Sequence, residues 1–177
     1  FGVPVFSQDD PTRIVAIDPG NALSAWCVLD GDRVLGFGKE PNSDVLIRCR
    51  REWSPLDAGD LLAVEMVQSF GMAVGQTIFE TILWTGRYVE AWERRQGKFQ
   101  LVYRKDVKMH LCQSMRAKDT NVRAELINRF GPGRDKAIGT KRQPGPLYGL
   151  SGDCWSSLAV GLTAAASVRL NALQAAA

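Results

Sequence analysis

The sequence has few of the residues that build disulfide or zinc scaffolds. It holds four cysteines and one histidine, and no two cysteines form a Cys-x-x-Cys pair. This spacing argues against a zinc knuckle and against a redox-active pair. We therefore expect reduced thiols and a cytoplasmic protein.

Long apolar runs are also missing. A membrane-spanning helix needs about 20 consecutive, mainly apolar residues, whereas polar residues such as Glu65, Gln68, Thr163 and Ser167 interrupt the short apolar stretches here. We expect no membrane-spanning segment. Neither sign of charge is in large excess, because 22 Lys and Arg against 19 Asp and Glu leave a net charge of +3. That balance identifies no partner by itself.

What is present is typical of one folded domain. The chain has 177 residues, 45% of them apolar, which is enough to bury a core and close to the usual size of one domain. The first twelve residues have neither a basic start followed by an apolar run nor a small-residue cleavage site, so they do not match a secretion signal. We predict an N-terminal tail over 1–12 and a single domain over 13–177.

Strand patterns dominate the first part of this domain. The run Arg-Ile-Val-Ala-Ile-Asp at 13–18 is apolar on both faces, as in a strand at the middle of a sheet. The dipeptide Asp30-Gly31 favours a hairpin, so the first three strands should form an antiparallel meander. The predicted strands cover 13–18, 22–29, 33–38, 61–65 and 99–103.

Helical patterns fill much of the remaining sequence. We predict helices over 44–53, 71–95, 106–113 and 119–130, and a last helix that starts at Asp153. Ser43 is expected to cap the first helix, and Asp119 or Thr120 the fourth. The segment 131–149 is rich in Gly and Pro, which predicts a loop without regular structure. The fold class is therefore α/β, a mixed five-stranded sheet flanked by helices.

Three acids share a special placement in this scheme. Asp18 ends the first strand, Glu65 ends the fourth, and Asp153 starts the last helix. If the first and fourth strands are parallel neighbours, Asp18 and Glu65 emerge side by side at the carboxyl edge, where α/β sheets bind their ligands. The start of the last helix would complete a triangle of carboxylates.

Such a triangle favours metal-assisted chemistry. Crowded carboxylates repel one another unless a divalent cation lies between them, and their oxygens suit magnesium or manganese. Two such ions could activate a water and stabilise the leaving oxygen in phosphodiester hydrolysis. Taken singly, Asp18 could merely begin a turn, Glu65 could be a solvated acid and Asp153 could cap a helix. It is their convergence on one edge that favours a functional site.

Three motifs, in this order and spacing, resemble RuvC-type Holliday junction resolvases, particularly their bacteriophage branch. They are Ile17-Asp18-Pro19-Gly20, Ala63-Val64-Glu65 and the run Gly-Asp-Cys-Trp-Ser-Ser-Leu-Ala-Val at 152–160, and the resemblance spans about 13–166. It implies an RNase H-like fold, and two magnesium ions, with manganese as a substitute, held by four acidic or equivalent residues. If the chain is phage-encoded, the resemblance places it in the cytoplasm of a bacterial host.

The sequence departs from that family at the fourth ligand. Asp18, Glu65 and Asp153 match the first three acids, but the acid expected three residues after Asp153 is replaced by Ser156. A hydroxyl is a neutral and weaker ligand. A second metal could therefore bind loosely, use Glu65 or water instead, or be absent.

Further residues are candidates for DNA contacts. The resemblance favours Lys118 near the scissile phosphate, with a solvated lysine as the alternative. Phe70, just after Glu65, could unstack bases at a junction or could simply pack in the core. Basic residues in the predicted loop could follow the DNA backbone, with salt-sensitive binding, or could be solvated. These loop residues are Arg134, Lys136, Lys141 and Arg142.

The main hypothesis is a structure-selective, divalent-metal-dependent DNA endonuclease that resolves four-way junctions in recombination and repair. Two symmetric nicks require two identical sites, so the resemblance and the substrate together favour a homodimer. Two alternatives stay open. One is an RNase H-like nuclease on an RNA-containing substrate, and the other is a non-catalytic branched-DNA-binding protein that lost its metal with the acid at Ser156.

Overall fold

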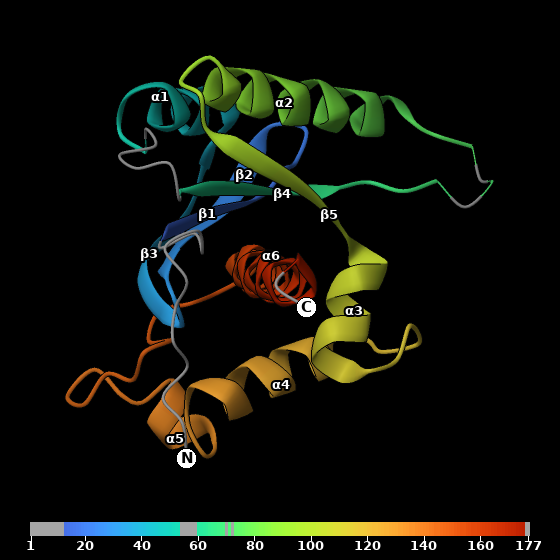
Figure 1. Ribbon diagram of the computed structural model, residues 1–177. Coiled ribbons are helices and arrows are strands. Elements are labelled where there is room, and N and C mark those ends of the chain that lie inside the picture. Colours follow the sequence, from blue (N-terminus) through green and yellow to red (C-terminus); the bar gives the residue numbers. More distant parts are fainter. Residues whose placement is uncertain (1–12, 54–59, 70, 72, 176–177) are drawn as a thin grey trace.

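A mixed five-stranded sheet forms the middle layer of the computed structural model, which describes residues 13–53, 60–69, 71 and 73–175 (Figure 1). The strand order is β3-β2-β1-β4-β5. The first three strands are antiparallel, and β4 runs parallel to both β1 and β5, which confirms the predicted α/β class. The strands are β1 (Arg13–Asp18), β2 (Leu23–Asp30), β3 (Arg33–Pro41), β4 (Leu61–Met66) and β5 (Lys98–Tyr103).

The hairpin between β2 and β3 lies one residue later than predicted. Asp30 pairs with Arg33, so the two turn residues are Gly31 and Asp32. Gly31 has φ of 56°, a left-handed conformation that glycine adopts at little cost.

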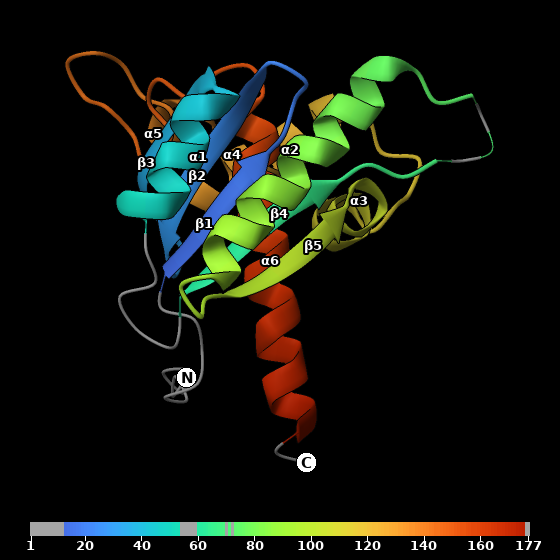
Figure 2. The ribbon, with the colours of Figure 1, turned by 90° about the horizontal axis from the view of Figure 1, so that it is seen from above.

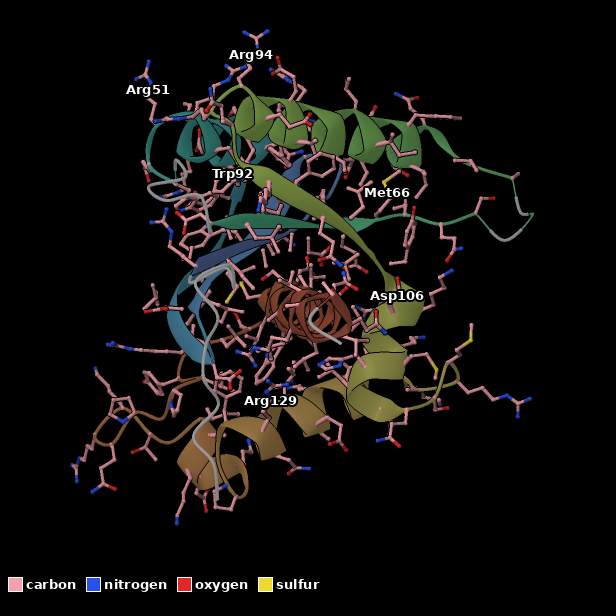
Figure 3. The ribbon with its side chains drawn as sticks, in the orientation of Figure 1. Arg51, Met66, Trp92, Arg94, Asp106 and Arg129 are labelled. Atoms are coloured by element: carbon pink, nitrogen blue, oxygen red, sulfur yellow. The ribbon has the colours of Figure 1, made fainter. Side chains whose placement is uncertain are left out.

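Two helices cover one face of the sheet. They are α1 (Asn42–Arg51) and α2 (Gln76–Glu93). Figure 3 shows Trp92 pointing from α2 toward the sheet, where it is fully buried, whereas Arg94 points away. This layer packs on the β-strand residues whose side chains face it, among them Val15, Ile17, Leu62 and Val64.

A long helix, α6 (Cys154–Ala175), lies against the opposite face (Figure 1). Its first twelve residues are nearly all buried, because the sheet covers one side and other helices cover the other. At Gly161, an added Cβ would lie 2.7 Å from Leu29 Cδ1 and 3.0 Å from Ala16 Cβ, so glycine permits the close approach of α6 to β1 and β2. The outer helices are α3 (Arg104–Cys112), α4 (Asp119–Phe130) and α5 (Arg134–Ala137).

Three local predictions are wrong, and tertiary contacts decide the outcome in two of them. The helix α1 starts at Asn42 with Pro41 as its N-cap, and Ser43 bonds only to Asp44. Asn42 is buried, and its backbone N–H donates a hydrogen bond to Ala22 O, in a distant part of the chain. This contact starts the helix one residue before Ser43. At α4 the contact is local: Lys118, not Asp119 or Thr120, is the N-cap, and its N–H donates to Asn121 Oδ1.

The third correction concerns the segment 131–149. It contains the short helix α5 and a bridge between Gly139 and Pro144. Ala137 and Leu147 are fully buried in the same core cluster as α6, and this burial orders a segment whose composition predicted only a loop.

In the part of the chain that the structure describes, no helix combines the length and apolar character needed to cross a bilayer. All four cysteines are free thiols. Burial raises the pKa of Cys27 and of Cys49 to about 12. The predicted tail over 1–12 lies outside the described residues.

Candidate metal site at the carboxyl edge of the sheet

The register of the parallel strands brings Asp18 and Glu65 together. Ile17 of β1 pairs with Val64 of β4, so the next residue of each strand lies at the same level of the carboxyl edge. Both side chains are on the α6 face, because they follow Ala16 and Ala63 at the two-residue period of a strand, and those alanines pack in the α6 cluster. The predicted pairing of these two acids is thus present.

A buried polar network fixes the turn that follows Asp18. Ser24 Oγ donates to Asn42 Oδ1 over 2.7 Å and lies 3.0 Å from Tyr88 Oη, and Asn42 Nδ2 donates to Gly20 O over 2.9 Å. At Gly20 an added Cβ would lie 2.4 Å from Leu23 O, so the turn requires glycine. The network links β2, α1 and α2 to the turn and so sets the direction in which Asp18 leaves the sheet.

Burial and mutual proximity favour the protonated form of the two carboxyl groups. Burial, then the neighbouring charges of Glu65 and Asp153, raise the pKa of Asp18 to about 8, and the Asp18 and Glu65 side chains are hydrogen-bonded to each other. Burial also raises the pKa of Glu65, although the positive charge of Arg104 and the hydrogen bond to Asp18 oppose this effect. A buried like-charge pair of this kind binds a proton or a metal ion.

Asp153 lies close to this pair but is held by a lysine. It immediately precedes α6, is exposed, and accepts a hydrogen bond from Lys39 Nζ over 2.5 Å. This bond, followed by the charges of Asp153 and Asp18, raises the pKa of Lys39. Lys39 is in register with Ala25 on β2, and Ala25 with Asp18 on β1, so the lysine lies two strands away in the same row and reaches across a small side chain.

An arginine borders the other side of the site. Arg104 Nη1 is 3.7 Å from Glu65 Oε1 and donates to Ser156 Oγ over 3.4 Å, while Nη2 bonds to Asp119 Oδ1 over 2.5 Å. Burial alone would lower the pKa of Arg104, but the charges of Glu65 and Asp119 raise it. Ser156 therefore contacts a cation at the position where an acid was expected.

The donor set fits a hard divalent cation. Two contacting carboxylates that bind a proton can exchange that proton for an ion with oxygen preference, and a third carboxylate is near. Within the described residues, no three Asp, Glu, His or Cys side chains are arranged as a metal-binding group, and Asp153 is paired with Lys39. The assignment of Asp18, Glu65, Asp153 and Ser156 as ligands of Mg²⁺ or Mn²⁺ stays a prediction.

A cavity of about 270 Å³ adjoins this cluster between the starts of α4 and α6. Asp153, Ser156 and Arg104 line one part of it. Arg123 lines another part and lies over the ring of Trp155, 4.6 Å from the ring centroid. Two guanidinium groups beside a carboxylate cluster give the cavity the chemistry to accept a phosphate-bearing chain.

The residues predicted to contact DNA are exposed wherever the structure describes them. Lys118 is exposed and directly precedes Asp119, the partner of Arg104. Four basic residues of the segment 131–149 are all exposed, and Figure 2 shows the segment after α5 extending on the side of β3. They are Arg134, Lys136, Lys141 and Arg142. Phe70 lies outside the described residues.

Sequence reasoning missed three charged residues of this site. Arg104 follows β5, which is parallel to β4, so the rule applied to Asp18 and Glu65 could have identified it. The proximity of Lys39 to the acids follows only from the pairing of β2 with β3. Asp119 was interpreted as a helix cap and not as a partner of Arg104. The cations beside the acids were therefore not predicted.

The likeness of this chain to known proteins is a likeness of fold. No family model and no curated protein matches the sequence. The structure is similar to Thermus thermophilus RuvC, with a TM-score of 0.63 and 17% identity over 90% of this chain and 96% of that one. For T. thermophilus RuvC in complex with a Holliday junction substrate, the TM-score is 0.65 at 18% identity, with the same coverage.

A third similar structure is the yeast mitochondrial Holliday junction resolvase, with a TM-score of 0.54 and 11% identity over 92% of this chain and 85% of that one. At these identities the likeness establishes the fold. The RuvC-like, RNase H-like architecture expected from the three motifs is confirmed, whereas the bacteriophage branch stays a prediction.

Proposed function

We propose that this protein is a divalent-metal-dependent endonuclease that cuts branched DNA at four-way junctions, in recombination and repair. The observation that carries this proposal is the contact between Asp18 and Glu65 at the ends of two parallel strands, with Asp153 close enough to act on both. Support also comes from the similar T. thermophilus RuvC, which was solved with a Holliday junction substrate.

The carboxylates define the chemistry. Asp18, Glu65 and Asp153 would hold the divalent ion, and Ser156 offers a neutral oxygen beside them. When bound, such an ion lowers the pKa of a coordinated water and neutralises charge on a phosphodiester. Binding of the ion would require the Asp18–Glu65 pair to be deprotonated and Asp153 to be released from Lys39.

The exposed basic residues provide the DNA contacts of the proposal. Lys118 lies at the start of α4 beside the cavity, where it approaches the scissile phosphate. Arg134, Lys136, Lys141 and Arg142 follow the backbone of one junction arm. Each neutralised phosphate releases counterions, so replacing these four residues by alanine should weaken junction binding and flatten its dependence on salt concentration.

A homodimer completes the proposal. The outer face of α2 is apolar and exposed, with Phe79 63% and Leu83 62% exposed, and an added Cβ at Gly86 would meet no atom within 4 Å. These residues, with Ile82, follow the three- and four-residue spacing of one helix face. We assign this face of α2 to a second copy of the chain, because a two-fold dimer has the two identical active sites that two symmetric nicks require.

Sedimentation analysis of Leu83→Glu tests the dimer. The wild-type chain should sediment as a dimer and Leu83→Glu as a folded monomer that no longer makes paired nicks. Leu173→Glu, the same change at an exposed leucine near the end of α6, is the matched control. A wild-type monomer in the presence of junction DNA would contradict this part of the proposal.

Cleavage assays on three labelled substrates test the function itself. We expect metal-dependent, paired nicks near the centre of a synthetic four-way junction, and no comparable cleavage of linear duplex or of an RNA/DNA hybrid. Each substrate is incubated with Mg²⁺, Mn²⁺ or a chelator. Preferred cleavage of the hybrid would instead identify the substrate as RNA-containing, and tight junction binding without cleavage in either metal would indicate a binding protein.

The same assay includes a matched pair of site variants. Glu65→Gln removes a charge from the pair and keeps its shape, so it should abolish cleavage and preserve junction binding. Glu93→Gln makes the same chemical change at an exposed position near the end of α2 and should cut like the wild type.

A further inference from the structure

The neutral residue at the fourth ligand position is matched by a cation that the structure places against it. Ser156 occupies the position where a fourth acid would bind a second ion, and its hydroxyl accepts a hydrogen bond from Arg104. A guanidinium therefore points to the place that a second ion would need. The inference drawn from this pairing rests on the proposed nuclease function.

Three elements fix this guanidinium. Glu65 lies at the end of β4, Ser156 in the first turn of α6 and Asp119 at the start of α4, and Arg104 reaches all three from the first position of α3. The side chain is 31% exposed and borders the cavity beside the carboxylates. A positive charge that three residues hold at the wall of a cavity is already oriented before any substrate binds.

The charges of the site agree with this arrangement. Three acidic ligands are balanced by one divalent ion and one guanidinium, and the remaining pair, Lys39 and Asp119, adds one charge of each sign. Four acidic ligands would instead balance two divalent ions. Ser156 in place of an acid removes one negative charge from the site, and Arg104 adds one positive charge. Together these two differences compensate for the charge of one divalent ion.

We propose that Arg104 takes the place of the second divalent ion, so that the site binds one ion through Asp18, Glu65 and Asp153, and Arg104 provides the other positive charge at the scissile phosphate. A water oxygen forms the new bond to phosphorus as the bond to the leaving sugar oxygen breaks. The water's proton passes to solvent, and the leaving oxygen takes a proton from solvent. Throughout, Arg104 donates N–H groups to phosphate oxygens, in the planar fork geometry that suits phosphate.

Metal stoichiometry without DNA is the first test. Titration of the full chain with Mn²⁺, followed by calorimetry and by electron paramagnetic resonance, should show one ion per wild-type chain. The double variant Ser156→Asp with Arg104→Gln restores the acid and removes the guanidinium, so it should bind two ions. A wild-type chain that binds two ions with similar affinity, or none, would overturn the inference.

Single-turnover junction cleavage is the second test. Arg104→Gln should bind one Mn²⁺ with unchanged stoichiometry and should cut roughly 100- to 1,000-fold more slowly, the usual loss when one charge-stabilising donor is removed. Arg104→Lys keeps the charge and should recover part of that loss. Arg51→Gln, at the exposed end of α1, is the control. Circular dichroism verifies that each variant folds.

The outcomes separate this inference from the proposed function. If the wild type cuts junctions and Arg104→Gln cuts them equally fast, the inference fails and the nuclease function stands. If the wild type cuts no substrate, the proposed function fails and the assignment of Arg104 to the scissile phosphate fails with it, even where the Mn²⁺ count is one.

Discussion

The strand half and the helix half of the candidate site are held in different ways. In the strand half, Asp18 and Glu65 end two paired parallel strands, are largely buried, and bond to each other. In the helix half, Asp153 is exposed and paired with Lys39, and Ser156 contacts Arg104. Backbone pairing fixes the first half, whereas side-chain pairing orients the second.

This difference shows where such a site can change. The position of a strand-end acid follows from the register of the sheet, and a shift of one residue would turn every side chain of the strand to the other face. Asp153 and Ser156 are less constrained, because their partners, Lys39 and Arg104, are long and flexible side chains. Consistent with this, the departure from the four-acid pattern lies in the helix half.

The largest expected effect is on cleavage, in the strand half. Asp18→Asn removes the charge and keeps the shape, so cleavage of a four-way junction should fall by at least about 1,000-fold, since several kcal/mol of transition-state stabilisation depend on the bound metal. Junction binding should remain. Asp44→Asn, an exposed acid in the first turn of α1, is the matched control. Wild-type cleavage rates in Asp18→Asn would remove this acid from the site.

The next effect concerns the packing that joins the two halves. Gly161→Val places a branched side chain against Ala16 and Leu29, so the free energy of unfolding should fall by about 2–3 kcal/mol, as in overpacked cores. Chemical denaturation measures this change. Ala175→Val, at the exposed end of the same helix, should change it by less than about 0.5 kcal/mol. Equal stability of the two variants would contradict the close approach of α6.

A smaller effect is the pH dependence of the metal-free protein. The pKa of Asp18 is raised from its ordinary value of 3.8 to about 8, so between these values the folded state binds a proton that the unfolded state has lost. Stability should therefore fall as the pH rises through this window. In chelator, the melting temperature should fall by roughly 2–8 °C between pH 5 and 8.5, the shift produced by about 1–2 kcal/mol in a chain of this size.

The matching variant isolates the group responsible. Asp18→Asn cannot titrate at this position, so its melting temperature should change less over the same pH range. If the variant and the wild type show the same pH dependence, the strand half does not carry the raised pKa.

The smallest expected effect is in the helix half. Lys39→Gln frees Asp153 from an exposed ion pair, and such pairs contribute at most about 1 kcal/mol. Mn²⁺ affinity should therefore rise by up to about fivefold, as measured by calorimetry. Lys98→Gln, an exposed change at the start of β5, should leave it unchanged. Weaker Mn²⁺ binding in Lys39→Gln would show that the lysine supports Asp153 instead of competing with the ion.

Local patterns in the sequence predicted the fold well because they arise from local physics. The apolar run at 13–18 became β1 with the same ends, and 119–130 became α4 with the same ends. In both cases periodicity and the flanking residues define the element. Predictions failed where a distant contact decided the structure, as at Asn42, whose buried bonds start α1 before Ser43.

The segment 131–149 shows the same limit. Its Gly and Pro content favours turns, yet the burial of Ala137 and Leu147 under α6 orders a short helix within it. Apolar burial of two residues outweighed the local preference of the backbone, and nothing within the segment identifies which apolar side chains reach the core.

The sequence by itself determined the two acids at strand ends, the acid before the last helix and the serine at the fourth position, because strand ends and helix starts are marked in local sequence. Only the tertiary structure decided which cations meet them. Lys39 pairs with Asp153 across 114 positions, and Arg104 reaches Ser156 across 52 positions. Charge pairing acts through space, and only the folded chain sets those distances.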